Sequence, residues 1–178
     1  MDVEQVVILQ ASYSNPMHAE AIAVVLDHYA RDPMGGGQAL DPQLLAQLPQ
    51  ELAKRAHAFS VLAFVNGQPA GLVNCFEGFS TFACRPLVNI HDVSVVPAHR
   101  GKGLSLKMLA KVEEIARQRG CCKLTLEVLE GNPAAQGSYR TFGFEHACFD
   151  PAHGAMQFWS KALEAAVNLR VTGTNDGC

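Results

Sequence analysis

The residues with the clearest chemical potential lie in one segment, residues 93–105, which reads VSVVPAHRGKGLS. An apolar run ends at a proline, Arg100, Gly101, Lys102 and Gly103 follow, and an apolar stripe at helical spacing begins directly afterwards. N–H groups at the start of a helix point outward, and the helix dipole favours negative charge there. Glycines let the backbone approach an anion closely, and the two cations add positive charge. The segment therefore predicts a phosphate or pyrophosphate site.

Two well-known phosphate loops fit this segment poorly, because it lacks the Ser/Thr of a Walker loop and the third glycine of a dinucleotide fingerprint. It resembles the Arg/Gln-x-x-Gly-x-Gly/Ala signature of the GNAT superfamily of N-acetyltransferases, with Leu104 within the match and Ser105 at its last position. In that family the loop holds the pyrophosphate of coenzyme A. Ser105 is small enough to keep the close approach, and its hydroxyl could itself meet a phosphate. The alternative is a basic turn that only caps a helix.

A second segment is similar to another GNAT motif, Asn-x-x-Ala-x-x-x-Tyr-x-x-x-Gly-Phe. Its matching positions are Asn132, Ala135, Tyr139, Gly143 and Phe144. The resemblance implies that Tyr139 lies beside the coenzyme sulfur and acts as general acid for the departing thiolate; the alternative is a packed, amphipathic tyrosine. Asn132 has two possible tasks, a helix N-cap and a polar contact near the cleft. The resemblance extends roughly over residues 6–163.

These motifs need a scaffold, and turn signals and periodicity predict one. Asn15-Pro16 and Asp41-Pro42 are typical helix starts, Pro49 is expected to break or kink the second helix, and Asn66-Gly67 indicates a hairpin. The expected strands are 6–10, 59–65, 69–77, 87–96, 123–128, 145–149 and 155–161. The expected helices begin at 16 and 42, follow Gly103 as far as Gly120, and cover 133–142.

The resulting order is a strand, two helices, three strands, a helix, a strand, a helix and two strands, an α/β arrangement with one mixed sheet. The GNAT-like acyl-CoA N-acyltransferase fold has this order, with splayed fourth and fifth strands. The resemblance implies that the backbone groups of Val93 and Val95 pair with the pantetheine arm in the gap. We expect one acetyltransferase domain over residues 1–166 and a C-terminal tail over residues 167–178.

Three residues are candidates for the general base that would deprotonate the amine. His91 and Asp92 lie on the strand before the glycine loop, and Glu77 lies on the strand before that. Strict alternation predicts that His91 and Asp92 face opposite sides, His91 with Val93. By its ordinary pKa near 6.5, His91 suits a base at neutral pH, whereas Asp92 could hold a cationic amine. Each could instead be a packed, solvated or ion-paired strand residue. The resemblance implies an acidic residue here, so histidine departs from it.

The acceptor side is weakly marked. Residues 34–37, a Met-Gly-Gly-Gly run, could be a mobile lid or an ordinary connection. Phe76, Phe79 and Phe82 could line a pocket or belong to the core.

Composition excludes several classes of protein. The 178 residues are 48% hydrophobic and 17% charged, with a net charge of -3, which gives no general attraction to nucleic acid or membranes. No apolar run is long enough to span a bilayer, and the acidic first residues do not resemble a signal peptide. The six cysteines lack metal-ligand spacing, so we expect reduced thiols in a cytoplasmic protein without a metal. The family resemblance allows a homodimer.

The leading hypothesis is therefore an acetyl-CoA-dependent N-acetyltransferase. It would move an acetyl group from acetyl-coenzyme A to a primary amine of a small molecule or peptide, by direct attack in a ternary complex. Two alternatives stay open: a non-catalytic acyl-coenzyme A binding or sensor protein on the same fold, and a nucleotide-binding protein that uses the loop for another phosphate ligand.

Overall fold

The computed structural model describes residues 4–146 and 159–161. The chain divides into two units, residues 1–145 and 146–178, and every helix and strand that the structure describes lies in the first. Glu145, His146 and residues 159–161 are not in strands, and the rest of the two predicted C-terminal strands lies outside the described residues, as does the predicted tail. The predicted domain boundary at residue 166 stays a prediction.

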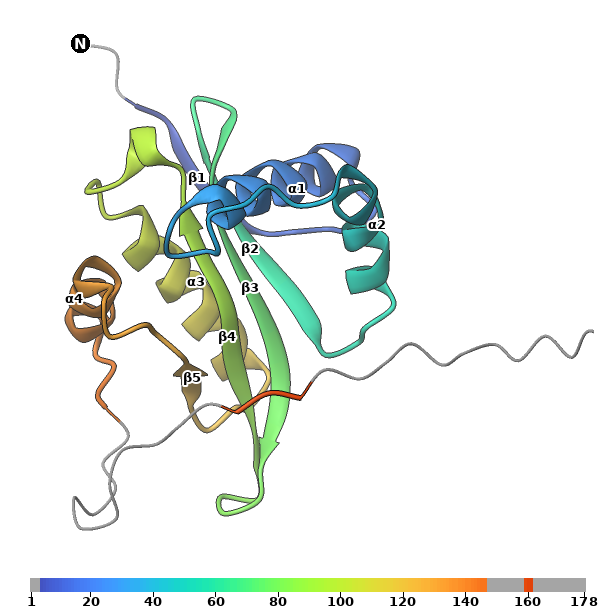
Figure 1. Ribbon diagram of the computed structural model, residues 1–178. Coiled ribbons are helices and arrows are strands. Elements are labelled where there is room, and N and C mark those ends of the chain that lie inside the picture. Colours follow the sequence, from blue (N-terminus) through green and yellow to red (C-terminus); the bar gives the residue numbers. More distant parts are fainter. Residues whose placement is uncertain (1–3, 147–158, 162–178) are drawn as a thin grey trace, which may run out of the picture. The chain divides into compact units, whose positions relative to one another are not determined.

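A five-stranded mixed sheet in the order β1-β2-β3-β4-β5 forms the centre of the first unit (Figure 1). Its first four strands are antiparallel neighbours, and β5 runs parallel to β4. The strands are β1 (Val6–Gln10), β2 (Ala58–Val65), β3 (Gln68–Ser80), β4 (Arg85–Val95) and β5 (Leu124–Leu126). The predicted mixed α/β fold is confirmed, with β5 shorter than expected.

Four α-helices cover the two faces of this sheet. They are α1 (Pro16–Arg31), α2 (Pro42–Ala53), α3 (Leu104–Gln118) and α4 (Pro133–Phe142), and a short 3-10 turn, η1 (Pro97–His99), precedes α3. One apolar cluster joins buried residues of α3 to β2, β3 and β4, and a second joins α1 and α2 to the other face of β2 and β3. The glycine loop and α4 therefore belong to one face of the sheet, and α1 and α2 to the other.

The turn signals explain where most elements begin. The side chains of Asn15, Asp41 and Asn132 each accept a hydrogen bond from a first-turn N–H, and each is followed by a proline at a position that needs no donor. Asn66 and Gly67 both have positive φ, +50° and +78°, as the predicted two-residue hairpin requires.

Of the two outcomes predicted at Pro49, the break is wrong, because α2 continues through Pro49 to Ala53, and the kink stays a prediction. A proline removes one helical hydrogen bond, but Pro49 and Leu52 are buried and Leu52 packs in the α1–α2 cluster. This burial outweighs the missing hydrogen bond, so the helix continues for four residues beyond Pro49.

Strand β4 contains a β-bulge that decides how its residues are oriented. Ile90 pairs with Cys75 and Asp92 pairs with Asn74, so His91 is an extra residue without an opposite partner. Beyond the bulge, Val93 packs with the α3 cluster, whereas His91 contacts the ring of Phe76, which packs with the α1–α2 cluster. The strict alternation that placed His91 with Val93 is therefore wrong, because the bulge shifts the pattern by one residue.

Candidate active site at the splayed strands

The separation of β4 and β5 creates an unpaired backbone edge. β5 pairs with β4 only at Val88, Asn89 and Ile90, although β4 continues to Val95. The Val96 N–H donates to Ala70 O on the β3 side, whereas Val95 O accepts from the Arg100 side chain, 2.9 Å away. Because these directions alternate, the N–H and C=O groups of Val93 and Val95 point away from β3. The predicted splay of the fourth and fifth strands is confirmed.

The glycine loop presents backbone donors at the start of α3. Gly101 and Gly103 have φ values of +75° and +74°, which side chains rarely adopt, and both face open space. Gly103 is the N-cap and supplies no side-chain acceptor. In the part of the chain that the structure describes, the N–H groups of the next three residues, 104–106, have no acceptor. Three free donors and the positive end of the helix dipole fit a phosphate group.

The cations beside this loop are already paired. Arg100 donates through Nε to Val95 O and through Nη2 to Asp32 Oδ2 at 2.8 Å, which connects the loop to the end of α1. Lys102 Nζ lies 2.9 Å from Glu4 Oε1. The hydrogen bond from Met34 N–H and that from Arg100 hold the pKa of Asp32 below its ordinary value. Both cations lie at the predicted phosphate site but share their charge with carboxylates.

Ser105 connects two helices. Its Oγ lies 2.9 Å from Ser138 Oγ on α4. The hydroxyl of Ser105, which stands where the family signature has Gly or Ala, thus has a partner within the protein. On the same helix, Asn132 caps the first turn through a bond from Ala135 N–H at 3.1 Å. The N-cap task predicted for Asn132 is therefore confirmed, and its polar contact with a ligand stays a prediction.

Tyr139 lies on α4 and is half-buried. It packs against the α3 cluster, with its ring 5.9 Å from that of Phe144. Burial, together with the nearby Tyr29, raises the pKa of Tyr139 to about 12. The pKa of Tyr29 is itself raised by burial and by the charge of Asp92. Tyr29 of α1 thus lies within electrostatic range of both Asp92 on β4 and Tyr139 on α4.

The three candidate bases have different surroundings. Glu77 pairs with Arg119 at 3.2 Å, close to the C-terminal end of α3. His91 is exposed, and its ring centroid lies 5.5 Å from that of Phe76. Asp92 is half-buried, and its Oδ2 accepts a hydrogen bond from Asn74 Nδ2 at 3.0 Å. Both carboxylates are thus held, that of Glu77 by a cation and that of Asp92 by a neutral amide.

The polar residues connected to Asp92 by hydrogen bonds were not predicted from the sequence. Asn74 also accepts from Ser60, whose Oγ lies 3.0 Å from the Tyr13 hydroxyl. The available signal was one polar residue inside each of two otherwise apolar runs, FSVLAFV and AGLVNCF. Buried polar groups of this kind are uncommon enough to need an explanation.

Among the other predicted acceptor features, Phe76 lies beside a candidate base, because its ring contacts that of His91. Of the three phenylalanines, only Phe76 is half-buried, and Phe79 and Phe82 are exposed at the far end of the β3–β4 hairpin. Residues 32–38 form a hydrogen-bonded turn, in which Gly35 N–H and Gly37 N–H donate to Asp32 O. Whether this turn opens as a lid stays a prediction.

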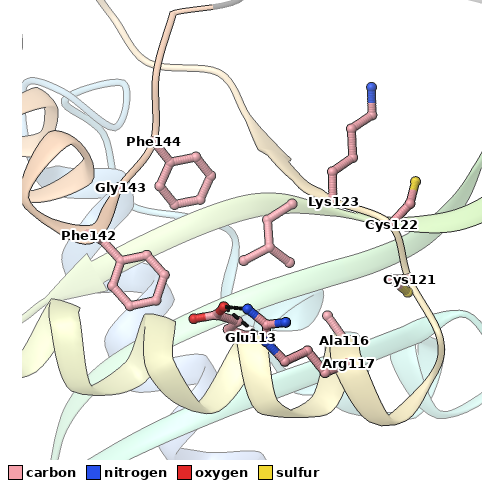
Figure 2. Close-up of a pocket in the computed structure, with 10 residues that line it drawn as sticks. Glu113, Ala116, Arg117, Cys121, Cys122, Lys123, Phe142, Gly143 and Phe144 are labelled. Atoms are coloured by element: carbon pink, nitrogen blue, oxygen red, sulfur yellow. Dashed lines mark hydrogen bonds and ion pairs between the residues drawn. The ribbon is translucent and has the colours of Figure 1, made fainter.

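A pocket of about 250 Å³ lies elsewhere on this unit, between the end of α3, the start of β5 and the end of α4 (Figure 2). Leu124, Phe142 and Phe144 line it, together with an ion pair between Glu113 and Arg117. A 15-residue helix is about 22 Å long, so this pocket is at the opposite end of α3 from the glycine loop. We do not assign the pyrophosphate to it.

Two further properties of the described residues bear on the chemistry. Among them, no three His, Cys, Asp or Glu side chains gather as metal ligands would, and no helix has both the length and the apolar character to cross a membrane. Cys75, Cys84, Cys121 and Cys122 are free thiols, and burial raises the pKa of Cys75 and of Cys121.

Comparison with known proteins decides the family. Residues 22–144 match the family described as Acetyltransferase (GNAT) family. The chain belongs to the GNAT family. This match covers both motifs and the strands β2 to β5, so the resemblance seen in the glycine loop is confirmed.

The GNAT chain also has individual relatives. It is 36% identical over 77 residues to streptothricin acetyltransferase of Streptomyces lavendulae, covering 43% of this chain and 41% of the relative. It is 34% identical over 84 residues to thialysine N-epsilon-acetyltransferase of Sus scrofa, covering 43% and 48%. The matches thus span less than half of these relatives' lengths.

Solved structures support the fold. An aminoglycoside N-acetyltransferase, AAC(6')-Iy, in complex with CoA has a TM-score of 0.69 at 17% identity, covering 91% of this chain and 98% of that one. A ribosomal-protein-alanine N-acetyltransferase from Brucella melitensis has a TM-score of 0.61 at 19% identity, covering 90% and 99%.

Proposed function

We propose that the protein is an acetyl-CoA-dependent N-acetyltransferase, acting on a primary amine of a small molecule or peptide. The observation that carries the proposal is the start of α3, where free N–H groups, two positive-φ glycines and two cations gather around one point. A pyrophosphate needs such donors. Membership of the GNAT family and the names of its relatives support the acetyl group as the cargo.

In this proposal the coenzyme lies along the unpaired edge of β4. The first-turn N–H groups of α3 and the cations Arg100 and Lys102 bind the pyrophosphate, and Gly101 and Gly103 permit its close approach. The outward N–H and C=O groups of Val93 and Val95 pair with the amides of the pantetheine arm. Unpaired backbone groups at a buried edge are costly, so this pairing would satisfy them. Arg100 must then share or release Val95 O.

The thioester end is assigned to the Asp92–Tyr29–Tyr139 region. The acceptor nitrogen attacks the thioester carbonyl, the C–N bond forms, the C–S bond breaks, and Tyr139 gives its proton to the departing sulfur. With a thiol pKa near 8.5, the protonated form of the departing sulfur is already favoured over the thiolate at pH 7. Tyr139 therefore speeds this departure rather than making it possible. The thiols are not nucleophiles here, and burial of Cys75 disfavours its thiolate.

The acceptor amine must lose a proton before it attacks. An amine with a pKa near 10.4 is about three units from neutral at pH 7, which costs roughly 4–5 kcal/mol. We assign its binding and deprotonation to Asp92 or His91, directly or through water. The Asp92 carboxylate is held by the neutral amide of Asn74, and His91 is the exposed alternative, whereas the Glu77 carboxylate is already paired with the cation Arg119. Reduced thiols support a cytoplasmic site of action.

The experiment is release of free thiol from acetyl-coenzyme A across a panel of amines, with mass spectrometry of the products. The panel includes streptothricin, thialysine, an aminoglycoside and a peptide with a free N-terminus, because relatives of this chain carry names of these kinds. We expect thiol release that depends on at least one amine, with one acetylated amine formed per thiol. Binding of coenzyme A without transfer to any amine would instead favour the sensor function.

A further inference from the structure

A chain of polar side chains runs beneath the α1–α2 face of the sheet and ends at Asp92. Tyr13 OH lies 3.0 Å from Ser60 Oγ, Ser60 donates to Asn74 Oδ1 at 2.7 Å, and Asn74 Nδ2 donates to Asp92 Oδ2 at 3.0 Å. The four residues come from the segment before α1 and from β2, β3 and β4. They are separated by up to 79 positions in the sequence but form one continuous network.

The carboxylate sets the direction of every bond in this network. An ionised carboxylate only accepts hydrogen bonds, so the amide of Asn74 must present its NH₂ group to Asp92. Its Oδ1 then accepts from Ser60, whose only proton is used in that bond. Tyr13 must therefore be the donor to Ser60 Oγ. Each member has one orientation, and the amide of Asn74 cannot flip without breaking two bonds.

Stability alone does not explain this network. Ser60 has an exposed fraction of 0% and Asn74 of 4%, and their neighbours along β2 and β3 are buried apolar residues. Replacing both partners of a buried hydrogen bond by apolar groups of the same shape can be nearly neutral or even stabilising. The polar chain also ends on a half-buried carboxylate just after the β4 bulge. Its position favours a role in holding that carboxylate.

We propose that Asn74 is a positioning residue for Asp92, and that Ser60 and Tyr13 lock the orientation of its amide. Asn74 occupies Oδ2 of Asp92, whereas Oδ1 has no hydrogen bond among the residues that the structure describes. This leaves Oδ1 to receive the acceptor ammonium or its proton. The inference rests on the proposed function, because it assigns Asp92 to the amine.

The test compares Asn74→Leu, Ser60→Ala and Tyr13→Phe, each alone and combined with Asp92→Asn. We expect kcat to fall roughly ten- to hundredfold for Asn74→Leu, less for Ser60→Ala and least for Tyr13→Phe, with unchanged coenzyme A affinity. In the Asp92→Asn background the same changes lower kcat no further, because the carboxylate that they position is gone. A residue that acts only through packing would lower kcat by the same factor in both backgrounds.

Ser80→Ala is the matched control, since Ser80 is a buried serine of β3 whose hydroxyl, among the described residues, accepts a hydrogen bond only from Ala83 N–H in the hairpin turn. Ser60→Ala and Tyr13→Phe each remove a single oxygen. If Asn74→Leu fails to fold, the kcat values of these two variants still test the inference. Wild-type kcat in all three single variants, or equal losses in both backgrounds, would overturn the inference while leaving the proposed function intact. A wild-type protein that acetylates no amine would overturn both.

Discussion

Tyr139 is the residue whose surroundings most restrict its chemistry. Burial against the α3 cluster and beside Phe144 disfavours the phenolate, so its pKa rises to about 12. It therefore holds its proton throughout the neutral range, as a proton donor to a leaving thiolate must. The same burial makes it unsuitable as a base, which leaves that task to His91 or Asp92.

Tyr139→Phe is expected to lower kcat by about 10²-fold or more, because it removes the proton donor and keeps the ring packing. Coenzyme A affinity should change little, since the phenol oxygen has no task in binding the pyrophosphate. Thiol-release kinetics and calorimetric titration measure the two quantities. Full turnover in this variant would remove Tyr139 from the mechanism.

The raised pKa of Tyr139 also has a consequence for stability. Between the ordinary tyrosine value of 10 and about 12, the folded protein keeps a proton that the unfolded chain has released. The contribution of protonated Tyr139 to the free energy of unfolding is thus fully present below pH 10 and is lost as the pH rises toward 12. A titration of tyrosinate absorbance should show a phenolate that forms near pH 12 and is absent in Tyr139→Phe. A group that titrates near pH 10 and disappears in the variant would contradict this.

The residue types predicted the conformation of the glycine loop well, but they did not predict which residue is the general base. The positive φ values of Gly101 and Gly103 and the cap at Asn132 follow from local chain chemistry, which a sequence contains. The facing of His91 depends on a bulge that exists only in the pairing of β3 with β4. The Asn74 network depends on three strands coming together, so no local pattern marks it.

Among the elements, α3 and α4 act together. Their ends were predictable from Gly103, Asn132 and Gly143, but the contact between the helices was not. The Ser105–Ser138 hydrogen bond places the helix that carries the phosphate donors beside the helix that carries Tyr139. The hydroxyl of Ser105, where the family signature has Gly or Ala, thus connects the two helices. From the sequence it was expected as a possible phosphate contact.

Ser105→Ala and Ser138→Ala are each expected to lower the free energy of unfolding by about 1 kcal/mol, the usual net value of one hydrogen bond. The double variant should lose little more than either single one, because both remove the same bond. Denaturant unfolding measures this, and coenzyme A affinity should be similar in both variants. Much weaker coenzyme A binding in Ser105→Ala than in Ser138→Ala would show that Ser105 contacts the phosphate instead.

At the scale of the molecule, ion pairs connect the donor loop to distant parts of the chain. Arg100 reaches Asp32, 68 positions away at the end of α1, and Lys102 reaches Glu4 before β1. The order of elements and the sheet were predictable, because periodicity and turn signals are local. These pairs were not, since they depend on how α1 and the glycine loop lie together in the fold.

Asp32→Asn is expected to tighten coenzyme A binding by up to about fivefold. The change keeps an oxygen for the Met34 N–H but removes the charge that competes with phosphate for Arg100. Arg100→Ala should weaken binding, and high salt should reduce both effects. Calorimetric titration at two ionic strengths gives the comparison. Weaker binding in Asp32→Asn would show that Asp32 holds Arg100 in place for the ligand.

The central claim is that the start of α3 binds the pyrophosphate of coenzyme A. Calorimetric titration of the wild-type protein with coenzyme A and with pantetheine, which lacks the pyrophosphate, tests it most directly. We predict binding of coenzyme A at micromolar concentration, at least about tenfold weaker binding of pantetheine, and a marked loss of coenzyme A affinity in Gly103→Ala. No binding of coenzyme A at that concentration, or equal affinity for the two ligands, would contradict the account.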